Sequence, residues 1–197
     1  MSPTEREGNL LFPVFLKLEE LNLLIVGGGN VGLEKLSAVL RNSPGAPVTL
    51  VSREMGEGVR ELAAGYPNVQ LVERPFVPED LEGKDIVIAA TDDPQLHVRI
   101  KAEAKARRVL ANVADTPHLC DFYLGSVVKK GDLKIAISTN GKSPTLAKRM
   151  REFLEAALPD TTQQLLDNLG QIRARIEGDF QAKLKALNEV TSGFLKP

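Results

Sequence analysis

The chain has 197 residues, of which 43% are apolar and 26% are charged, a balance typical of a soluble globular protein. This length accommodates one domain with an appendage or two small domains, and it excludes a large multidomain enzyme. The 25 basic residues nearly cancel the 26 acidic ones, so no excess of positive charge is available to neutralise a nucleic acid. We therefore expect no nucleic-acid partner, and any cationic site has to be local.

Cysteine and histidine are scarce. The single cysteine, Cys120, cannot form an internal disulfide, and His97 and His118 are too few for a structural zinc site. Residues 1–8 carry acids and no long apolar stretch, unlike a secretory signal, and no apolar run reaches the ~18 residues of a membrane span. These features predict a cytoplasmic protein with no membrane segment and no resident metal.

Apolar runs alternate with helix-competent stretches in the first half of the chain. Residues 21–26 form a short apolar run that ends in glycines, as a buried parallel strand does. The apolar spacing over residues 31–40 predicts a helix that stops before the breakers at 42–45. Further strand candidates lie at 48–51, 69–72, 86–90 and 109–113. This alternation predicts a parallel sheet covered by helices on both faces, over about residues 10–113.

The pattern changes after residue 113. A loop-rich passage leads to a strand candidate at 133–138, and Ser143 followed by Pro144 is a strong signal for the start of a helix. From Thr161 onward, apolar residues recur at steps of three and four, which predicts one helix of several turns whose apolar stripe needs a partner surface. The stripe consists of Leu165, Leu169, Ile172, Ile176, Phe180, Leu184 and Leu187.

A glycine-rich segment joins the first predicted strand to the first helix and matches the pattern G-x-G-x-x-G. In this context Gly27 allows a tight turn, Gly29 lets the backbone approach a pyrophosphate, and Gly32 lets helix and strand pack closely. The alternative is that the glycines only make the turn. The segment predicts a dinucleotide site formed by Gly27, Gly28, Gly29, Asn30, Val31 and Gly32.

The end of the second predicted strand is where such a fingerprint expects an acid that grips the ribose hydroxyls. Here Ser52 occupies that position, Glu54 follows it as a late acid, and Arg53 favours an additional 2′-phosphate. We expect all three to contact the cofactor, and an ordinary solvated loop residue is the alternative for Arg53. The choice between NAD and NADP is poorly encoded.

Polar residues also follow the fourth predicted strand at its carboxyl end, where ligands bind in open α/β sheets. Thr91 and Asp92 are candidates for the nicotinamide side of the site. A helix cap explains the segment equally well, because Asp93 precedes Pro94, and for Asp93 we favour the cap.

The segment Gly141-Lys142-Ser143 resembles part of a phosphate-binding P-loop, but that motif requires glycine where this chain has Ala136. The segment still leaves backbone N–H groups free at a helix start, which attracts an anion such as a carboxylate. Asn140, Lys142 and Ser143 are therefore candidates for binding an anionic substrate. Lys148, Arg149 and Arg151 add positive charge nearby, and a solvated basic helix face is the alternative.

Several segments together resemble the precorrin-2 dehydrogenase family, the NAD-dependent enzymes of sirohaem synthesis, which also form the N-terminal module of sirohaem synthases. Generic Rossmann proteins lack the later segments. In chain order the matching segments are Pro13–Leu16, Val26–Lys35, Ala89–Asp93, Asn112–Asp115, Cys120–Phe122, Ile135–Ala147 and Arg151–Leu154.

The resemblance implies an α/β fold with a Rossmann-type parallel sheet over residues 1–113. It further implies a small α+β dimerisation and substrate domain over 114–147 and a C-terminal helical region over 148–197. Members oxidise precorrin-2 to sirohydrochlorin with NAD and form interlocked homodimers. Bifunctional members also act as sirohydrochlorin ferrochelatases, with ferrous iron as a co-substrate, and the sequence leaves open whether this chain does so.

The resemblance also implies residue roles. It places the essential carboxylate at Asp115, after the fifth strand, where a positioned base contributes about 10²–10⁴-fold to a rate. A turn before Thr116-Pro117 is the alternative. Ser126 matches a substrate-contacting serine that is phosphorylated in a fused sirohaem synthase, but Gly125 and Lys130 depart from the family pattern and weigh against modification. His118 is a further candidate for substrate contact, with a plain loop residue as the alternative.

Two other functions are weighed against this enzyme. A nucleotide-sensing regulatory module also uses a Rossmann domain, but it usually has an acid at the position of Ser52 and does not need residues 135–147. A noncatalytic tetrapyrrole carrier is the third possibility.

Overall fold

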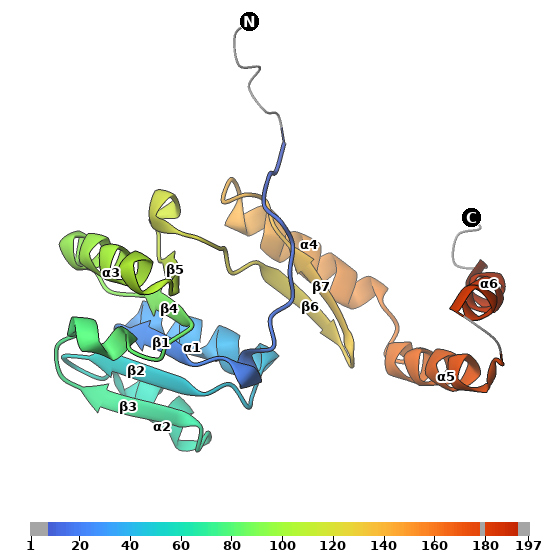
Figure 1. The fold of residues 1–197 in the computed structure, drawn as a ribbon, viewed down its shortest axis with the longest axis horizontal. Helices are drawn as coiled ribbons and strands as arrows, with labels where there is room; N and C mark the ends of the chain where they lie inside the picture. The colour runs from blue at the N-terminus through green and yellow to red at the C-terminus, as the bar shows by residue number, and fades with distance from the viewer. Residues whose placement is uncertain (1–7, 178–179, 193–197) are drawn as a thin grey trace, which may run out of the picture. The chain divides into compact units, whose positions relative to one another are not determined.

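The structure is a computed structural model that describes residues 8–177 and 180–192 (Figure 1). The chain divides into two compact units, Met1–Leu124 and Gly125–Pro197. Residues 1–7, which bear on the expectation that no secretory signal is present, lie outside the described residues. The domain boundaries expected after residues 113 and 147 stay predictions.

The first unit is built on a five-stranded sheet with the order β3-β2-β1-β4-β5, and all of its strand pairs are parallel. The order reverses between β1 and β4, which is where ligands bind in doubly wound sheets. The strands are β1 (Leu23–Val26), β2 (Val48–Ser52), β3 (Val69–Glu73), β4 (Ile86–Ala89) and β5 (Leu110–Val113).

Helices cover both faces of this sheet, as the alternating pattern predicts (Figure 1). The Rossmann-type α/β fold is thereby confirmed. The α-helices of the unit are α1 (Asn30–Asn42), α2 (Glu57–Ala64) and α3 (Pro94–Arg107), and its short 3-10 helices are η1 (Leu18–Glu20), η2 (Pro78–Leu81) and η3 (Pro117–Leu119).

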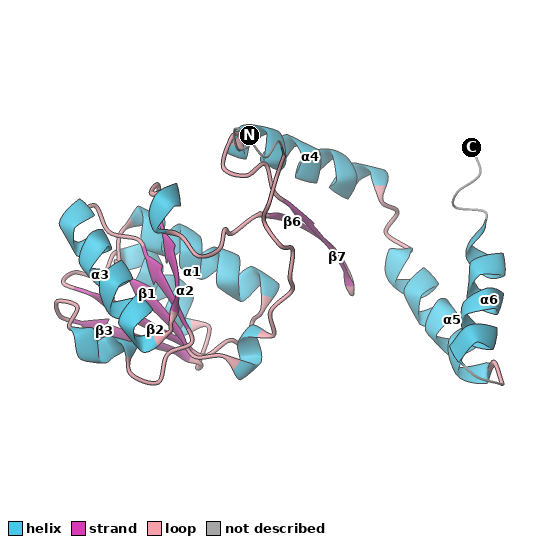
Figure 2. Cartoon of the chain, turned by 45° about the horizontal axis from the view of Figure 1, so that its top comes forward, coloured by secondary structure: helices cyan, strands magenta, loops and turns pink. Residues whose placement is uncertain are grey.

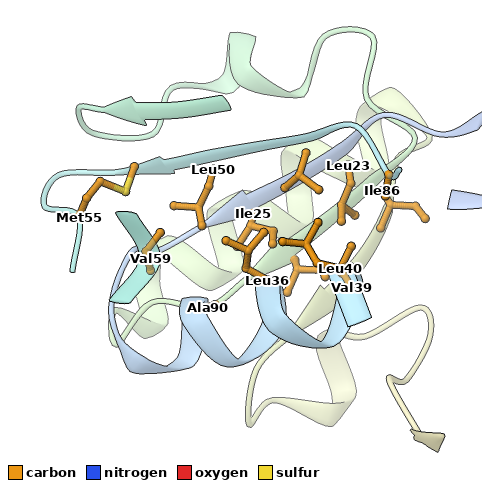
Figure 3. Packing of buried hydrophobic residues seen from close by; sticks show 13 residues of the cluster. Leu23, Ile25, Leu36, Val39, Leu40, Leu50, Met55, Val59, Ile86 and Ala90 are labelled. Carbon is orange, nitrogen blue, oxygen red and sulfur yellow. The ribbon is translucent and has the colours of Figure 1, made fainter. Parts of the chain in front are cut away.

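The core of the first unit follows from strands that are buried on both faces. In β1, Leu23 and Ile25 point to the side of α1 and α2, whereas Leu24 and Val26 point to the side of α3. Figure 3 shows the first of these clusters, in which side chains from α1 pack against the sheet. Because both faces are covered, the strands read as unbroken apolar runs, and this is why the sequence predicts them.

The second unit contains a two-stranded antiparallel sheet of β6 (Ser126–Lys130) and β7 (Leu133–Ile137), against which α4 (Pro144–Ala157) packs. The sequence pattern predicts β7 and α4 but not β6. The missed signal is a β-branched pair followed by Gly131-Asp132, a typical two-residue hairpin turn. Gly131 has φ +60°, which suits the first position of such a turn.

The expected single C-terminal helix is wrong. The structure has two helices instead, α5 (Thr162–Arg175) and α6 (Phe180–Thr191), and they contact each other (Figure 2). Helix α5 ends because Ile176 is extended, with φ −69° and ψ 118°. The sequence continues with Gly178, a residue that disfavours helix by about 1 kcal/mol relative to alanine.

No helix among residues 8–177 and 180–192 is long and apolar enough to cross a bilayer.

Replacing Ile25 by alanine tests the core. Ile25 is 0% exposed in the central strand, so Ile25→Ala should lower the free energy of unfolding by about 2–5 kcal/mol. The matched control is Leu110→Ala on the edge strand β5, where the side chain is 45% exposed and little apolar burial is lost. Urea unfolding measures both, and equal losses for the two variants would contradict this account of the core.

Candidate functional site

The glycine-rich turn after β1 is tight because of two backbone contacts. Gly27 has φ +120°, and its N–H donates to Val51 O over 2.9 Å. A Cβ added at Gly27 would lie 2.3 Å from Ala90 O, closer than real Cβ atoms come. Only glycine fits here, so the turn itself requires Gly27, as the motif predicts.

Gly32 and Gly29 have different surroundings. A Cβ at Gly32 would lie 2.0 Å from Gly27 O, so this glycine lets α1 pack directly on the preceding turn. A Cβ at Gly29 would meet nothing within 4 Å, and Gly29 is the N-cap residue of α1. The first amides of α1 therefore begin beside open space, and a helix start of this kind is suited to a phosphate. This open cradle fits the pyrophosphate of a dinucleotide.

The loop after β2 lies against the glycine-rich turn. Gly56 N–H donates to Gly28 O over 2.9 Å, and a Cβ at Gly28 would lie 2.5 Å from Glu54 O. Ser52, the last residue of β2, is half-buried, whereas Arg53 and Glu54 are exposed. The structure thus brings these three candidate residues beside the cradle.

Glu73 at the end of β3 holds this loop in place. Its carboxylate accepts hydrogen bonds from the Met55 amide at 3.2 Å and from Arg60 Nη2 at 2.7 Å. The bond from Arg60 and then the bond from the Met55 amide hold the pKa of Glu73 below its ordinary value. Glu73 lies opposite Ser52 on the neighbouring strand, and its carboxylate pairs with Arg60.

The segment after β4 contains a helix cap. Asp93 Oδ1 accepts from the amides of Gln95 at 2.9 Å and Leu96 at 3.1 Å, so the capping role that we favoured for Asp93 is confirmed. Thr91 is half-buried and Asp92 is exposed, both at the carboxyl end of β4.

The loop after β5 places Asp115 in an unusual conformation. Asp115 is exposed with φ +54°, and the Thr116 amide donates to Val113 O over 3.2 Å to close a turn around it. Aspartate tolerates this left-handed region better than most residues because its short polar side chain bonds locally. His118 is exposed in η3, two residues beyond this turn.

Residues 120–122 fold back along β5, which the sequence analysis did not anticipate. Asn112 is 6% exposed, and its Nδ2 donates to Phe122 O over 2.9 Å. Two of the segments that carried the family resemblance, Asn112–Asp115 and Cys120–Phe122, are thus parts of one structural feature. Hydrogen bonds of this kind leave no periodic signal in a sequence.

The remaining candidates lie in the second unit. Asn140 and Gly141 have φ +54° and +74°, and Lys142 N–H donates to Thr139 O over 3.0 Å, so they form the tight turn that Asn-Gly favours. Ser143 Oγ caps α4 by accepting from the Leu146 amide at 3.1 Å. Lys142 is exposed, and Ser126 begins β6 half-buried.

The positive charge on α4 is largely paired within the helix. Lys148 and Arg149 both reach Glu152, at 4.0 and 2.8 Å, and Arg151 reaches Glu155 at 2.8 Å. These pairs favour the alternative of a solvated helix face over a dedicated cationic patch.

Parallel strands bring the first group of candidates to one place. The cradle, residues 52–54, residues 91–92 and the loop with Asp115 and His118 all follow the carboxyl ends of strands in the same sheet. These ends form a single edge, so the candidates of the first unit share it. Within the described residues, no three His, Cys, Asp or Glu side chains gather as metal ligands would.

Two family models match the chain. One describes putative NAD(P)-binding proteins and matches residues 14–126, more than half of the chain. The other describes the central part of sirohaem biosynthesis proteins and matches residues 130–157. The chain belongs to the family of putative NAD(P)-binding proteins, and its residues 130–157 match the central part of sirohaem biosynthesis proteins. The predicted family and NAD-type cofactor are thereby confirmed.

Curated members of the sirohaem family are similar over most of this chain. The sirohaem synthase of Psychrobacter arcticus is 37% identical over 176 residues, which cover 89% of this chain and 31% of the relative. Siroheme synthase 1 of Serratia proteamaculans is 34% identical over 177 residues, which cover 90% of this chain and 36% of the relative. The chain thus spans only a part of these longer proteins.

A solved member of similar fold is SirC, a precorrin-2 dehydrogenase. It aligns with a TM-score of 0.70 and 24% identity, covering 91% of this chain and 89% of SirC. This likeness supports the fold described above for the present chain.

Substitutions in the glycine motif should separate cofactor binding from folding. Gly29→Val has room for its Cβ, so this variant should fold but lose detectable NAD binding, because the side chain occupies the space that a phosphate needs. Gly32→Ala should instead lose about 1–3 kcal/mol of stability through overpacking. Calorimetric titration with NAD and urea unfolding measure the two effects.

The control is Gly65→Ala, whose Cβ would lie at an ordinary 3.6 Å from Leu62 O, far along the chain from the cradle. It should change neither quantity. A folded Gly29→Val variant that binds NAD like the parent would show that the cradle is not the site.

Proposed function

We propose that this chain is a precorrin-2 dehydrogenase, which oxidises precorrin-2 to sirohydrochlorin with NAD. The observation that carries the proposal is that the glycine cradle and the exposed carboxylate of Asp115 follow strands of one sheet edge. The match of residues 130–157 to the central part of sirohaem biosynthesis proteins supports the tetrapyrrole substrate, and similarity to sirohaem synthases supports it further.

Residues of the first unit hold the cofactor in this proposal. The amides at the start of α1, beginning with Asn30 and Val31 after Gly29, bind the pyrophosphate, with Gly27, Gly28 and Gly32 shaping the turn. Ser52, Arg53 and Glu54 contact the adenosine ribose, and Thr91 and Asp92 line the nicotinamide side. NAD, when bound, supplies the acceptor for the hydride that leaves the substrate.

Asp115 completes the chemistry as a general base. Oxidation of precorrin-2 removes two hydrogens, one as the hydride and one as a proton. A carboxylate oxygen of Asp115 accepts that proton and returns it to solvent, to which the side chain is exposed. The left-handed φ of +54° at Asp115 is the kind of local strain that functional sites retain.

The substrate contacts that we propose are His118, Ser126, Asn140, Lys142 and Ser143. An exposed lysine beside a helix start suits the carboxylates of a tetrapyrrole. Ferrous iron insertion, known in bifunctional members of the family, stays a prediction. In that reaction the macrocycle nitrogens receive the iron, and no protein metal site is needed.

We also propose that the chain works as a homodimer in the cytoplasm. Among the described residues of the second unit, only Val128 and Ala147 are buried apolar residues, whereas Leu146, Met150 and Phe153 are exposed on one side of α4. Their spacing of four and three residues forms an apolar stripe, and such a stripe marks an interaction surface. A second copy covers it in this proposal.

The dehydrogenase assay tests the function. The full chain, incubated anaerobically with precorrin-2 and NAD, should form sirohydrochlorin, followed by absorption spectroscopy. Asp115→Asn should keep the fold and bind NAD but lose about 10²-fold or more in rate, because an amide does not accept the proton.

Asp115→Gly is the matched control for the turn. Glycine removes the carboxylate but adopts a φ of +54° without strain, so the variant should be at least as stable as the parent and still lose activity. If Asp115 only shapes the turn, Asp115→Gly should keep near-parental rates, and that result would remove Asp115 from the chemistry.

Light scattering tests the dimer. The parent should behave as a dimer at micromolar concentration, and Phe153→Glu should shift it toward monomer by placing a charge in the apolar stripe, where Phe153 is 65% exposed. Val98→Glu is the control, since Val98 is 58% exposed on α3 of the first unit. A monomeric parent would contradict the proposed assembly.

A further inference from the structure

The edge strand β5 has one free side. In the described sheet it pairs only with β4, so the backbone N–H and C=O groups of alternate residues point away from the sheet. Such an edge ordinarily pairs with water or with another strand. Here Ala111 and Val113 present these groups, and the returning segment 120–122 meets them.

Asp121 forms hydrogen bonds with the outward-pointing backbone N–H and C=O groups of Ala111. The Asp121 amide donates to Ala111 O over 2.8 Å, and the Ala111 amide donates to Asp121 Oδ2 over 2.9 Å. Lys101 Nζ on α3 lies 2.5 Å from Asp121 Oδ1. Burial alone would raise the pKa of Asp121, but the bonds from Lys101 and the Ala111 amide hold that pKa below its ordinary value, so the carboxylate stays charged.

The side chain of Cys120 forms hydrogen bonds with the backbone N–H and C=O groups of Val113. Its Sγ accepts from the Val113 amide at 3.2 Å and lies 3.2 Å from Val113 O and 3.5 Å from Thr116 O, to which the thiol can donate. Burial raises the pKa of the Cys120 thiol, which keeps its proton available for donation. Asn112 Nδ2 also lies 3.6 Å from this sulfur.

Both ends of the loop between Val113 and Cys120 are therefore fixed to the same strand. This loop carries Asp115 and His118, and its internal backbone bonds run from the Thr116 amide to Val113 O, from the Leu119 amide to Thr116 O and from the Cys120 amide to Pro117 O. Groups that act in chemistry need supporting residues that lock their geometry. Residues 120–121 supply that support here through their hydrogen bonds to Ala111 and Val113.

We propose that Cys120 and Asp121 are positioning residues, which hold the loop of residues 114–119 so that Asp115 meets the substrate. The proposal rests on the proposed dehydrogenase function and deepens it. We name residues 120–121 the β5 strap. The strap sets the rate of the chemical step and leaves NAD binding unchanged, because the glycine cradle lies after a different strand.

Variants of the strap test this. Cys120→Val keeps the size of the side chain but removes its donor and acceptor, whereas Cys120→Ser keeps both. Cys120→Val and Asp121→Ala should each lower kcat by about 10-fold or more, while the dissociation constant for NAD stays within about 2-fold. Cys120→Ser should restore most of kcat, which a packing role would not require.

Asp80→Ala is the matched control. Asp80 also accepts from one backbone amide, that of Val77 at 2.9 Å, and from one cationic side chain, Arg74 Nη1 at 2.9 Å, but it lies in η2, within the connection from β3 to β4. The Asp80→Ala variant should lower the melting temperature, as Asp121→Ala does, but it should leave kcat unchanged. Equal losses of kcat in both Asp variants would overturn the proposal.

A double variant and hydrogen exchange separate failure of the strap from failure of the function. If the strap acts through Asp115, adding Asp121→Ala to Asp115→Asn should lower kcat by less than about 2-fold further, as coupled residues do. A full additional loss would overturn the proposal.

Amide hydrogen exchange of Thr116 and Leu119 needs no substrate. It should speed up in Asp121→Ala and Cys120→Val but not in Asp80→Ala, and unchanged exchange would overturn the strap. If the parent chain forms no sirohydrochlorin, the dehydrogenase proposal fails, and the exchange result alone then decides whether residues 120–121 hold the loop.

Discussion

The close approach of α1 to the turn after β1 is the constraint on which the candidate site depends. A Cβ at Gly32 would lie 2.0 Å from Gly27 O, so the helix starts on the carboxyl end of the central strand only because both positions lack side chains. This contact directs the first amides of α1 into open space at Gly29. The loop after β2 then packs on Gly28, beside the candidate cofactor cradle.

The fold was predicted where burial alone determines the pattern. Strands covered on both faces appear as apolar runs, and Asp93 before Pro94 correctly indicated a cap. β6 was missed because only Val128 in it is buried and two adjacent lysines end the strand, so no apolar run forms. The single C-terminal helix was wrong because period-3.6 spacing continued across Ile176, where the backbone turns away from helix. Periodicity reports which residues face apolar surroundings, not whether the chain stays continuous between them.

The candidate site was predicted where backbone chemistry demands a residue type. The motif alone predicts why glycine is needed at positions 27, 29 and 32. The segment formed by Cys120 and Asp121 had no such signal, because thiol and carboxylate groups bonded to a distant strand edge leave no spacing to detect. The same holds for Glu73, whose carboxylate reaches the Met55 amide from the neighbouring strand.

The three glycines of the motif are kept by different demands. Gly27 and Gly32 are required by neighbouring backbone atoms, whether or not a ligand is ever bound, whereas Gly29 faces nothing of the protein itself. A related protein of this fold that binds no nucleotide would be free to replace Gly29 while retaining the other two. The residue at position 29 of a related sequence would then indicate whether that protein binds a nucleotide.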